Sequence, residues 1–138
     1  MTANPGFGKA KITGSIEGPF FPGEMQSFTT GATRSADEDK LDYEGFLSPF
    51  VLERYAQYLH KHRIQADGQP RESDNWQKGM PRARYLKSAI RHMIDTWKEW
   101  RRYPGNEAAE HFQDLLCAIL FNVIGLLHEI LVGRDIRD

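Results

Sequence analysis

The sequence has a single cysteine, Cys117, and can therefore form no internal disulfide. Cys117 lies in the apolar run LLCAILF, where burial raises the pKa of a thiol. This setting favours a small buried hydrophobic side chain, with a reactive thiol as the alternative. A chain without disulfides is typical of a reducing compartment, and we therefore predict a cytoplasmic protein.

An excess of charge of either sign is also missing, since 18 basic residues stand against 19 acidic ones. No overall field therefore attracts the chain to nucleic acid or to an anionic membrane surface. No apolar run reaches the roughly 18–20 residues that span a bilayer. The N-terminal segment lacks the continuous apolar core of a signal peptide. We expect a soluble protein with no nucleic-acid partner and no membrane partner.

The first part of the chain has little hydrophobic periodicity. Residues 1–30 contain five glycines and three prolines, and they sustain neither a helical nor a strand period. Residues 29–46 are polar and charged. We therefore predict an irregular N-terminal arm over residues 1–28 and a domain over residues 29–138 that begins with a polar loop.

Helical periodicity begins near residue 48 and predicts an all-α fold. Ser48 can cap the first helix, and Pro49 suits its first position, where a missing N–H costs nothing. A second helix is expected after Pro81, running to about Arg102. Its apolar stripe consists of Leu86, Ala89, Ile90, Met93, Trp97 and Trp100.

A third helix is expected from about Glu107 to Leu131, ended by Gly133. Residues 115–121 are apolar on every side, which indicates burial all round. Three helices are too few to surround such a helix. We therefore expect a helical bundle completed by oligomerisation, as a homodimer or homotetramer.

One narrow stripe of the third helix is polar or small. At 100° per residue its members fall within about an 80° sector. A buried polar group must find a partner, because an unpaired one costs roughly 1–3 kcal/mol. Either Asn122 is a structural residue bonded to a neighbouring helix, or the stripe lines a cleft. The stripe consists of His111, Asp114, Ala118, Asn122, Gly125 and Glu129.

Charge is sorted between the last two helices although the total is nearly neutral. Residues 78–102 carry eight basic and two acidic side chains, a net charge of +6. Residues 107–131 carry four acidic side chains and no basic one. Attraction between the two helices explains this sorting. A polyphosphate site, with carboxylates holding a divalent cation and arginines binding phosphate oxygens, is the alternative explanation.

Two His-x-x-Asp pairs are the main candidates for chemistry. His92 and Asp95 fall on the second helix, and His111 and Asp114 near the start of the third. This spacing places both side chains of a pair on one side of a helix. Each pair alone is also an ordinary surface arrangement, whereas two facing pairs would suit Mg²⁺ or Mn²⁺. Two more carboxylates could join them, those of Glu53 and Glu129.

The segment SDNWQKGMP, residues 73–81, is expected to form a loop, in which Asp74 and Asn75 can set a turn. Trp76 is either folded back onto the helices as a cover for the core or exposed as a stacking platform for a base. Lys78 could approach a phosphate in the second case.

Five segments between Thr29 and Glu129 carry a family resemblance, and DNWQKG followed by S-x-x-RH is its most specific part. They are TTGATRSADEDKLDYEGFLSP, LERYAQYLHKHR, SDNWQKGMP, YLKSAIRHMIDTW and LLCAILFNVIGLLHE. In the same order they resemble the phage-encoded dATP/dGTP diphosphohydrolases. That family belongs with the MazG-like all-α nucleoside triphosphate pyrophosphohydrolases. Residues 1–28 lie outside the resemblance.

The resemblance implies a MazG-like bundle that cleaves a purine deoxynucleoside triphosphate to the monophosphate and pyrophosphate in the host-cell cytoplasm, using Mg²⁺ or Mn²⁺. MazG-like enzymes carry Glu-Glu-x-x-Glu on one helix and Glu-x-x-Asp on the next. The first motif falls on Arg91, His92 and Asp95, and the second on His111 and Asp114. Histidine thus replaces glutamate in each motif, and arginine replaces the leading glutamate.

The resemblance also implies a role for each matching residue. Asp95 and Asp114 would be direct metal ligands, and His92 or His111 a further ligand or the base that orients water. Basic side chains would bind the phosphates. Side chains of the loop at residues 73–81 would cover the base or the sugar, and a polar side chain of the third helix would line the floor of the cleft. The residues in these substrate-binding roles are Arg91, Lys78, Arg84, Arg34, Lys40, Trp76, Asn75 and Asn122.

Two other functions stay open. The altered acidic motifs suit a non-catalytic nucleotide-binding protein, for instance one that sequesters a nucleotide signal or tunes a phage replication enzyme. The third function is an all-helical interaction protein that docks through its glycine-rich arm. That function gives no reason for DNWQKG or for the polar stripe.

Overall fold

The computed structural model describes residues 25–36 and 39–137, which fall into two compact units divided between Leu47 and Ser48. Most of the described chain is helical, which confirms the all-α prediction in its coarse form. The units divide at a later point than the boundary that we predicted after residue 28. Residues 1–24 of the predicted arm lie outside the described residues.

The first unit contains a two-stranded antiparallel sheet, which the sequence did not predict. β1 (Met25–Ser27) pairs with β2 (Thr33–Ser35). The turn between them includes Gly31 at φ +87°, a conformation that side chains with a Cβ rarely adopt. Residues 25–27, near the end of the predicted arm, therefore form a strand of this sheet rather than irregular chain.

The first unit also contains one short helix, α2 (Tyr43–Phe46). Asp42 caps it, because its carboxylate accepts the N–H of Gly45 at 2.8 Å. The predicted polar loop over residues 29–46 thus includes a strand and a helical turn.

The second unit begins with α3 (Pro49–Lys61), as the sequence predicts. Ser48 Oγ accepts the N–H of Val51 at 3.3 Å, and Pro49 occupies the first turn. A loop follows that includes the 3₁₀ helix η2 (Asn75–Lys78).

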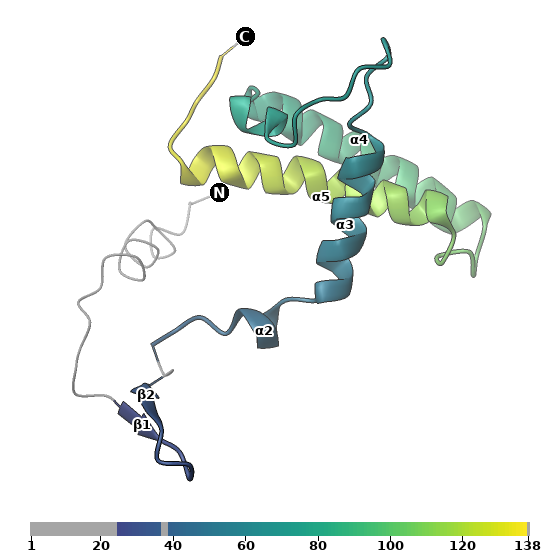
Figure 1. Cartoon of the computed structure of the whole chain (residues 1–138). Coiled ribbons are helices and arrows are strands. Elements are labelled where there is room, and N and C mark those ends of the chain that lie inside the picture. The colour runs from purple at the N-terminus through teal and green to yellow at the C-terminus, as the bar shows by residue number, and fades with distance from the viewer. Residues whose placement is uncertain (1–24, 37–38, 138) are drawn as a thin grey trace, which may run out of the picture. The chain divides into compact units, whose positions relative to one another are not determined.

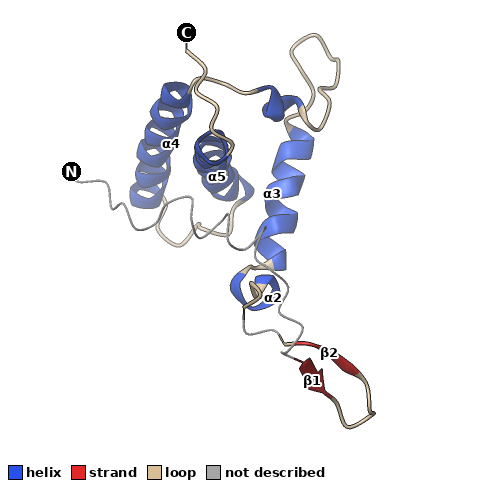
Figure 2. Ribbon diagram, turned by 90° about the vertical axis from the view of Figure 1, so that its left-hand side faces the viewer, coloured by secondary structure: helices blue, strands red, loops and turns tan. Residues whose placement is uncertain are grey.

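Two long helices form an antiparallel hairpin in this unit, α4 (Arg82–Arg102) and α5 (Glu110–Leu131). At one end, which we call the turn end, Glu99 Oε1 lies 4.0 Å from His111 Nε2. At the other end, the open end, Arg82 Nη2 donates to the carbonyl oxygen of Glu129 at 3.4 Å. Figure 1 shows α4 and α5 side by side, and Figure 2 shows α5 between α4 and α3.

The core of the second unit is the seam between α4 and α5. Tyr85 of α4 is 1% exposed and lies against Gly125 of α5. A Cβ at position 125 would overlap the Tyr85 ring, so the close approach of the two helices requires glycine there. Ala89 and Ala118 are buried in the same unit. Small residues thus make room for one large aromatic ring.

Four of the six stripe residues, Ala118, Asn122, Gly125 and Glu129, are buried, so they do not line the open cleft that was one of our two interpretations. Asn122 is 6% exposed, and its Nδ2 donates to the Ala118 carbonyl of its own helix at 2.8 Å. Its partner is therefore one turn back on α5 rather than on the neighbouring helix. Asn122 is structural in this arrangement, because its amide is buried and satisfied locally.

The apolar stripe of α4 is turned away from the core, contrary to what its composition suggested. Of the predicted stripe Ala89 is buried, as is Tyr85, which was not part of that stripe, whereas the other stripe residues are about half exposed. Residues 115–121 of α5 are likewise not buried all round, since Leu116 is 44% exposed. α5 is long and apolar enough to cross a membrane, judged by its length and composition alone. Core helices of soluble proteins can have the same length and composition.

Candidate functional site

The candidate residues of the second unit divide between the two ends of the hairpin. His111 and Asp114 lie at the turn end, whereas Glu129 and the η2 loop lie at the open end. At 1.5 Å per residue, the α4 segment from Arg82 to Glu99 is about 25 Å long. The predicted residues therefore do not form one site in this unit.

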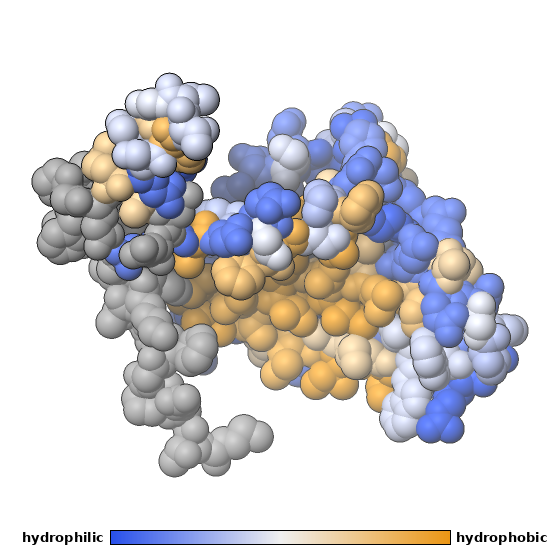
Figure 3. All heavy atoms as spheres, turned by 90° about the horizontal axis from the view of Figure 1, so that it is seen from below, coloured by the Kyte–Doolittle hydropathy of each residue, from blue (hydrophilic) through white to orange (hydrophobic). Residues whose placement is uncertain are grey.

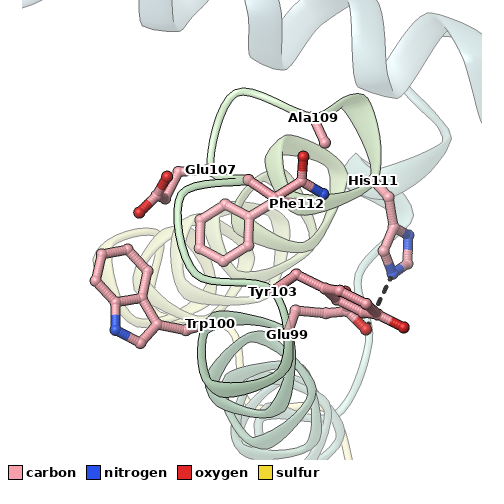
Figure 4. A pocket seen from close by; sticks show the side chains of 8 residues that line it. Glu99, Trp100, Tyr103, Glu107, Ala109, His111 and Phe112 are labelled. Atoms are coloured by element: carbon pink, nitrogen blue, oxygen red, sulfur yellow. Dashed lines mark ion pairs between the residues drawn. The ribbon is translucent and has the colours of Figure 1, made fainter.

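A small hollow of about 20 Å³, room for roughly one water molecule, lies at the turn end. Figure 4 shows the His111 ring directed toward the Glu99 carboxylate, while Trp100 and Phe112 lie on another side of the hollow. The ring centroids of Trp100 and Phe112 are 6.1 Å apart. This hollow brings an acid and a histidine from two helices together beside an aromatic wall.

Asp114, a predicted metal ligand, is held by two cations of α3. Arg54 Nη2 lies 2.7 Å from Oδ1 and Lys61 Nζ lies 2.6 Å from Oδ2. Burial raises the pKa of Asp114, but the hydrogen bonds from Lys61 and then Arg54 outweigh it and hold that pKa below its ordinary value. Both carboxylate oxygens are thus engaged in docking α3 onto α5.

Glu129, another predicted ligand, is fully buried at the open end. Arg134 binds it through two hydrogen bonds of 2.6 Å, from Nε to Oε2 and from Nη2 to Oε1. The Arg134 hydrogen bonds hold the pKa of Glu129 below its ordinary value despite burial. Arg134 also donates to the Gln77 carbonyl at 2.7 Å, and Arg82 donates to the Arg134 carbonyl at 3.1 Å. The pair joins the η2 loop, α4 and the end of α5.

The η2 loop packs on this end of the hairpin. Trp76 meets His128 edge-on with ring centroids 4.6 Å apart. Gly79 adopts φ +91° and lies so close to Arg134 and Ile136 that a Cβ would overlap both side chains. The structure therefore favours the interpretation of Trp76 as a cover for the helices. Asn75 is half-buried beside it, and Lys78 is exposed.

The remaining candidates on α4 are largely at the surface. Asp95 is exposed, and Arg91 Nη2 donates to the Ser88 hydroxyl at 2.7 Å. His92 is half-buried, and its Nδ1 is buried without a hydrogen-bond partner among the described residues. Arg84 is exposed near the start of the helix.

Three candidates lie elsewhere. Glu53 is exposed on α3. Arg34 and Lys40 belong to the first unit, where Lys40 Nζ donates to Ser35 Oγ at 2.7 Å.

The described residues do not fit a resident metal ion. Over residues 25–36 and 39–137, no group of three or more His, Cys, Asp or Glu side chains is close enough to hold one. Asp114 and Glu129 are bound to cations, at opposite ends of the hairpin. The predicted Mg²⁺ or Mn²⁺ site therefore has no counterpart within one described chain.

Sequence reasoning missed four side chains that matter here: Arg54, Lys61, Glu99 and Arg134. Arg54 and Lys61 are seven residues apart, so they share one side of α3, and this spacing was a usable signal. Glu99 follows Asp95 at a helical interval and also extends the polar side of α4. The pairing of Arg134 with Glu129 had no sequence signal, because it requires the chain to turn back after Gly133.

Comparison with known proteins adds no relative, since no family model, no curated protein and no solved structure matches this chain.

Proposed function

We propose that this protein binds a purine deoxynucleoside triphosphate at the turn end of the hairpin and hydrolyses it to the monophosphate and pyrophosphate. The observation that carries the proposal is the meeting of Glu99 and His111 across the antiparallel helices. The sequence resemblance to MazG-like pyrophosphohydrolases supports the same reaction, and the assignment to that fold is part of the proposal.

A row of cations lies on the same stretch of α4. Arg91, Lys98 and Arg102 follow at intervals of seven and four residues, which places them on one side of the helix, and all three are exposed. Lysine and arginine at such spacing can bind successive phosphate groups of one chain. Lys98 and Arg102 flank Glu99, so bound phosphate would lie near the Glu99–His111 pair.

In the proposed reaction, His111 takes a proton from a water molecule whose oxygen attacks the α-phosphorus. The bond between that phosphorus and the α,β-bridging oxygen breaks, and the oxygen leaves with pyrophosphate. The Glu99 carboxylate stabilises the imidazolium that forms. Lys98 and Arg102 bind the negative charge that develops on the leaving group.

Binding without hydrolysis is the second candidate function. The observation that favours it is the state of the carboxylates: Asp114 is bound by Arg54 and Lys61, and Glu129 by Arg134. A nucleotide held by the cations of α4 would then be sequestered rather than cleaved. The same surface carries both functions, and only product formation separates them.

The experiment uses the purified full-length protein with each of the four deoxynucleoside triphosphates, in Mg²⁺, in Mn²⁺ and in a chelator. Chromatography measures the monophosphate, a coupled assay measures pyrophosphate, and thermal unfolding is followed in parallel. Equal release of both products supports hydrolysis. A raised Tm without products supports the second function, and neither effect with any nucleotide contradicts both.

A further inference from the structure

The hairpin of α4 and α5 presents a continuous apolar surface, which we call the apolar face. On each helix its residues lie beside the seam, not in it. Each of these large side chains is 44–58% exposed. Figure 3 shows the hydrophobic side chains gathered into one broad area on one face of the molecule. The face consists of Leu86, Ile90, Met93, Ile94, Trp97, Trp100, Leu116, Val123, Leu127 and Ile130.

On α5 the polar and apolar sides are separate. On α5, Asp114 is directed to α3, where it meets Arg54 and Lys61. At 100° per residue, Val123 and Leu127 lie about 140–180° away from Asp114 around the helix. On α4, Met93 and Trp97 lie about 100–160° from Lys98 and Arg91 on the same basis. On α4 the apolar face borders the cation row, because Ile94 lies one turn before Lys98 and both residues line one hollow with Trp97, Arg101 and Arg102.

The face is too large for an isolated chain. Ten large apolar side chains, each about half exposed, present on the order of 800 Å², taking roughly 200 Å² for each tryptophan and about 150 Å² for each of the other eight. A monomer rarely exposes a contiguous apolar patch of more than a few hundred Å². A stable interface needs about 800 Å² from each partner. The area available thus matches what a dimer requires.

We propose that the apolar face is the interface of a homodimer, in which the hairpins of two copies stack as a four-helix bundle. A second copy supplies an identical face, so a two-fold axis across it pairs like surface with like surface. The bulky Trp97 and Trp100 lie toward the turn end, and the smaller Val123 and Ile130 toward the open end. An antiparallel pairing places large side chains against small ones.

The same arrangement covers the part of α5 that one chain leaves open. The segment 115–121 is apolar on all sides, yet Leu116 is 44% exposed in one chain. In a four-helix bundle, α4 and α3 of its own chain and the hairpin of the partner surround it. Insertion of α5 into a membrane would instead separate Asp114 and Glu129 from their cations and place carboxylates in hydrocarbon.

The test is the mass of the full-length protein in solution, from 50 μM to 50 nM, by light scattering and analytical ultracentrifugation. Wild type is expected at twice 15.9 kDa at the higher concentrations. The double variant Met93→Glu/Val123→Glu is expected to be monomeric with unchanged helical circular dichroism, because both positions are exposed in one chain. Phe50→Glu, at an exposed apolar position of α3 outside the face, is the matched control and should remain dimeric.

Tryptophan fluorescence gives a second readout. Dilution of wild type through the dissociation range should shift the emission to the red as Trp97 and Trp100 become exposed, and the shift should be absent from Trp97→Phe/Trp100→Phe. A monomeric wild type at 50 μM overturns the proposal, as does a dimer that survives the double glutamate variant. A monomer that co-sediments with phosphatidylcholine–phosphatidylglycerol vesicles also overturns it and assigns the face to a membrane.

Discussion

Glu129 and Arg134 form a two-bond ion pair in which the carboxylate is fully buried and the guanidinium is partly exposed. The pair closes the open end of the hairpin, since Arg134 also binds the carbonyl of Gln77 in the η2 loop. A buried carboxylate is stable only while its partner remains, because it has lost its hydration.

Arg134→Ala should therefore destabilise the fold strongly by leaving Glu129 buried without a counter-charge. We expect Tm to fall by several degrees in thermal unfolding followed by circular dichroism. Arg137→Ala, which removes an exposed arginine paired only with Asp135, is the control and should leave Tm nearly unchanged. Equal effects of the two variants would contradict the structural role of Arg134.

The same ion pair predicts acid sensitivity. The pKa of Glu129 in the folded protein lies below its ordinary value of 4.5, so the unfolded chain binds the proton more tightly. The stabilisation is present above about pH 4.5 and is lost as the pH falls through the lowered folded pKa. Urea unfolding measured from pH 7 to pH 3 should show this loss as a fall in the free energy of unfolding. The free energy of unfolding of Glu129→Gln/Arg134→Met should depend less steeply on pH.

Asp114 is expected to anchor α3. Asp114→Asn replaces a carboxylate that accepts from both Arg54 and Lys61 and should lower the free energy of unfolding by about 1–3 kcal/mol. The matched control is Glu110→Gln, because Glu110 meets Lys61 at 3.1 Å but is 76% exposed, and it should have little effect. If Asp114 were instead free to bind a metal, Asp114→Asn would change the free energy of unfolding little when it is measured in the presence of a chelator.

Gly125 and Tyr85 are expected to be energetically coupled. Gly125→Ala places a methyl group where the Tyr85 ring lies. We expect it to lower the free energy of unfolding by about 1–3 kcal/mol, although alanine is the better helix former. Tyr85→Leu should make room for that methyl group. A double-mutant cycle measures the coupling, and additive effects of the two substitutions would mean that the helices are not in close contact there.

The proposed hydrolysis depends on His111. His111→Ala should lower kcat by at least about a hundredfold while nucleotide binding is retained, which is the usual magnitude for loss of a general base. His60→Ala, at an exposed histidine of α3, should match wild type. Steady-state product release measures both variants, and full activity of His111→Ala would remove this residue from the reaction.

The helices follow from local sequence. Ser48 and Pro49 predict the start of α3, because serine caps a helix and proline suits its first turn. Gly133, with its positive φ, predicts the end of α5. The β-hairpin at residues 25–35 could not, because its strands are three residues long and carry no clear alternation. Short pairings depend on their partner strand more than on their own composition.

The candidate site was less predictable than the helices. Periodicity shows which residues share one side of a helix, but it does not show which other helix packs against that side. The polar stripe of α5 was identified as one surface from sequence, yet the structure divides it: Gly125 lies in the seam against Tyr85, whereas Asp114 binds two cations of α3. Asp114 was identified as a candidate, but its engagement by Arg54 depends on α3 crossing α5.

Sequence by itself determined the three long helices, the Ser48 cap of α3 and the amphipathic pattern of each helix, because these depend on interactions within a few residues. Only the tertiary structure decided that α4 packs through Tyr85 and Ala89 and leaves Met93 and Trp97 exposed. The physical reason is steric fit, because Gly125 leaves room for the Tyr85 ring and close packing favours that seam. The apolar residues left outside are what a partner must cover.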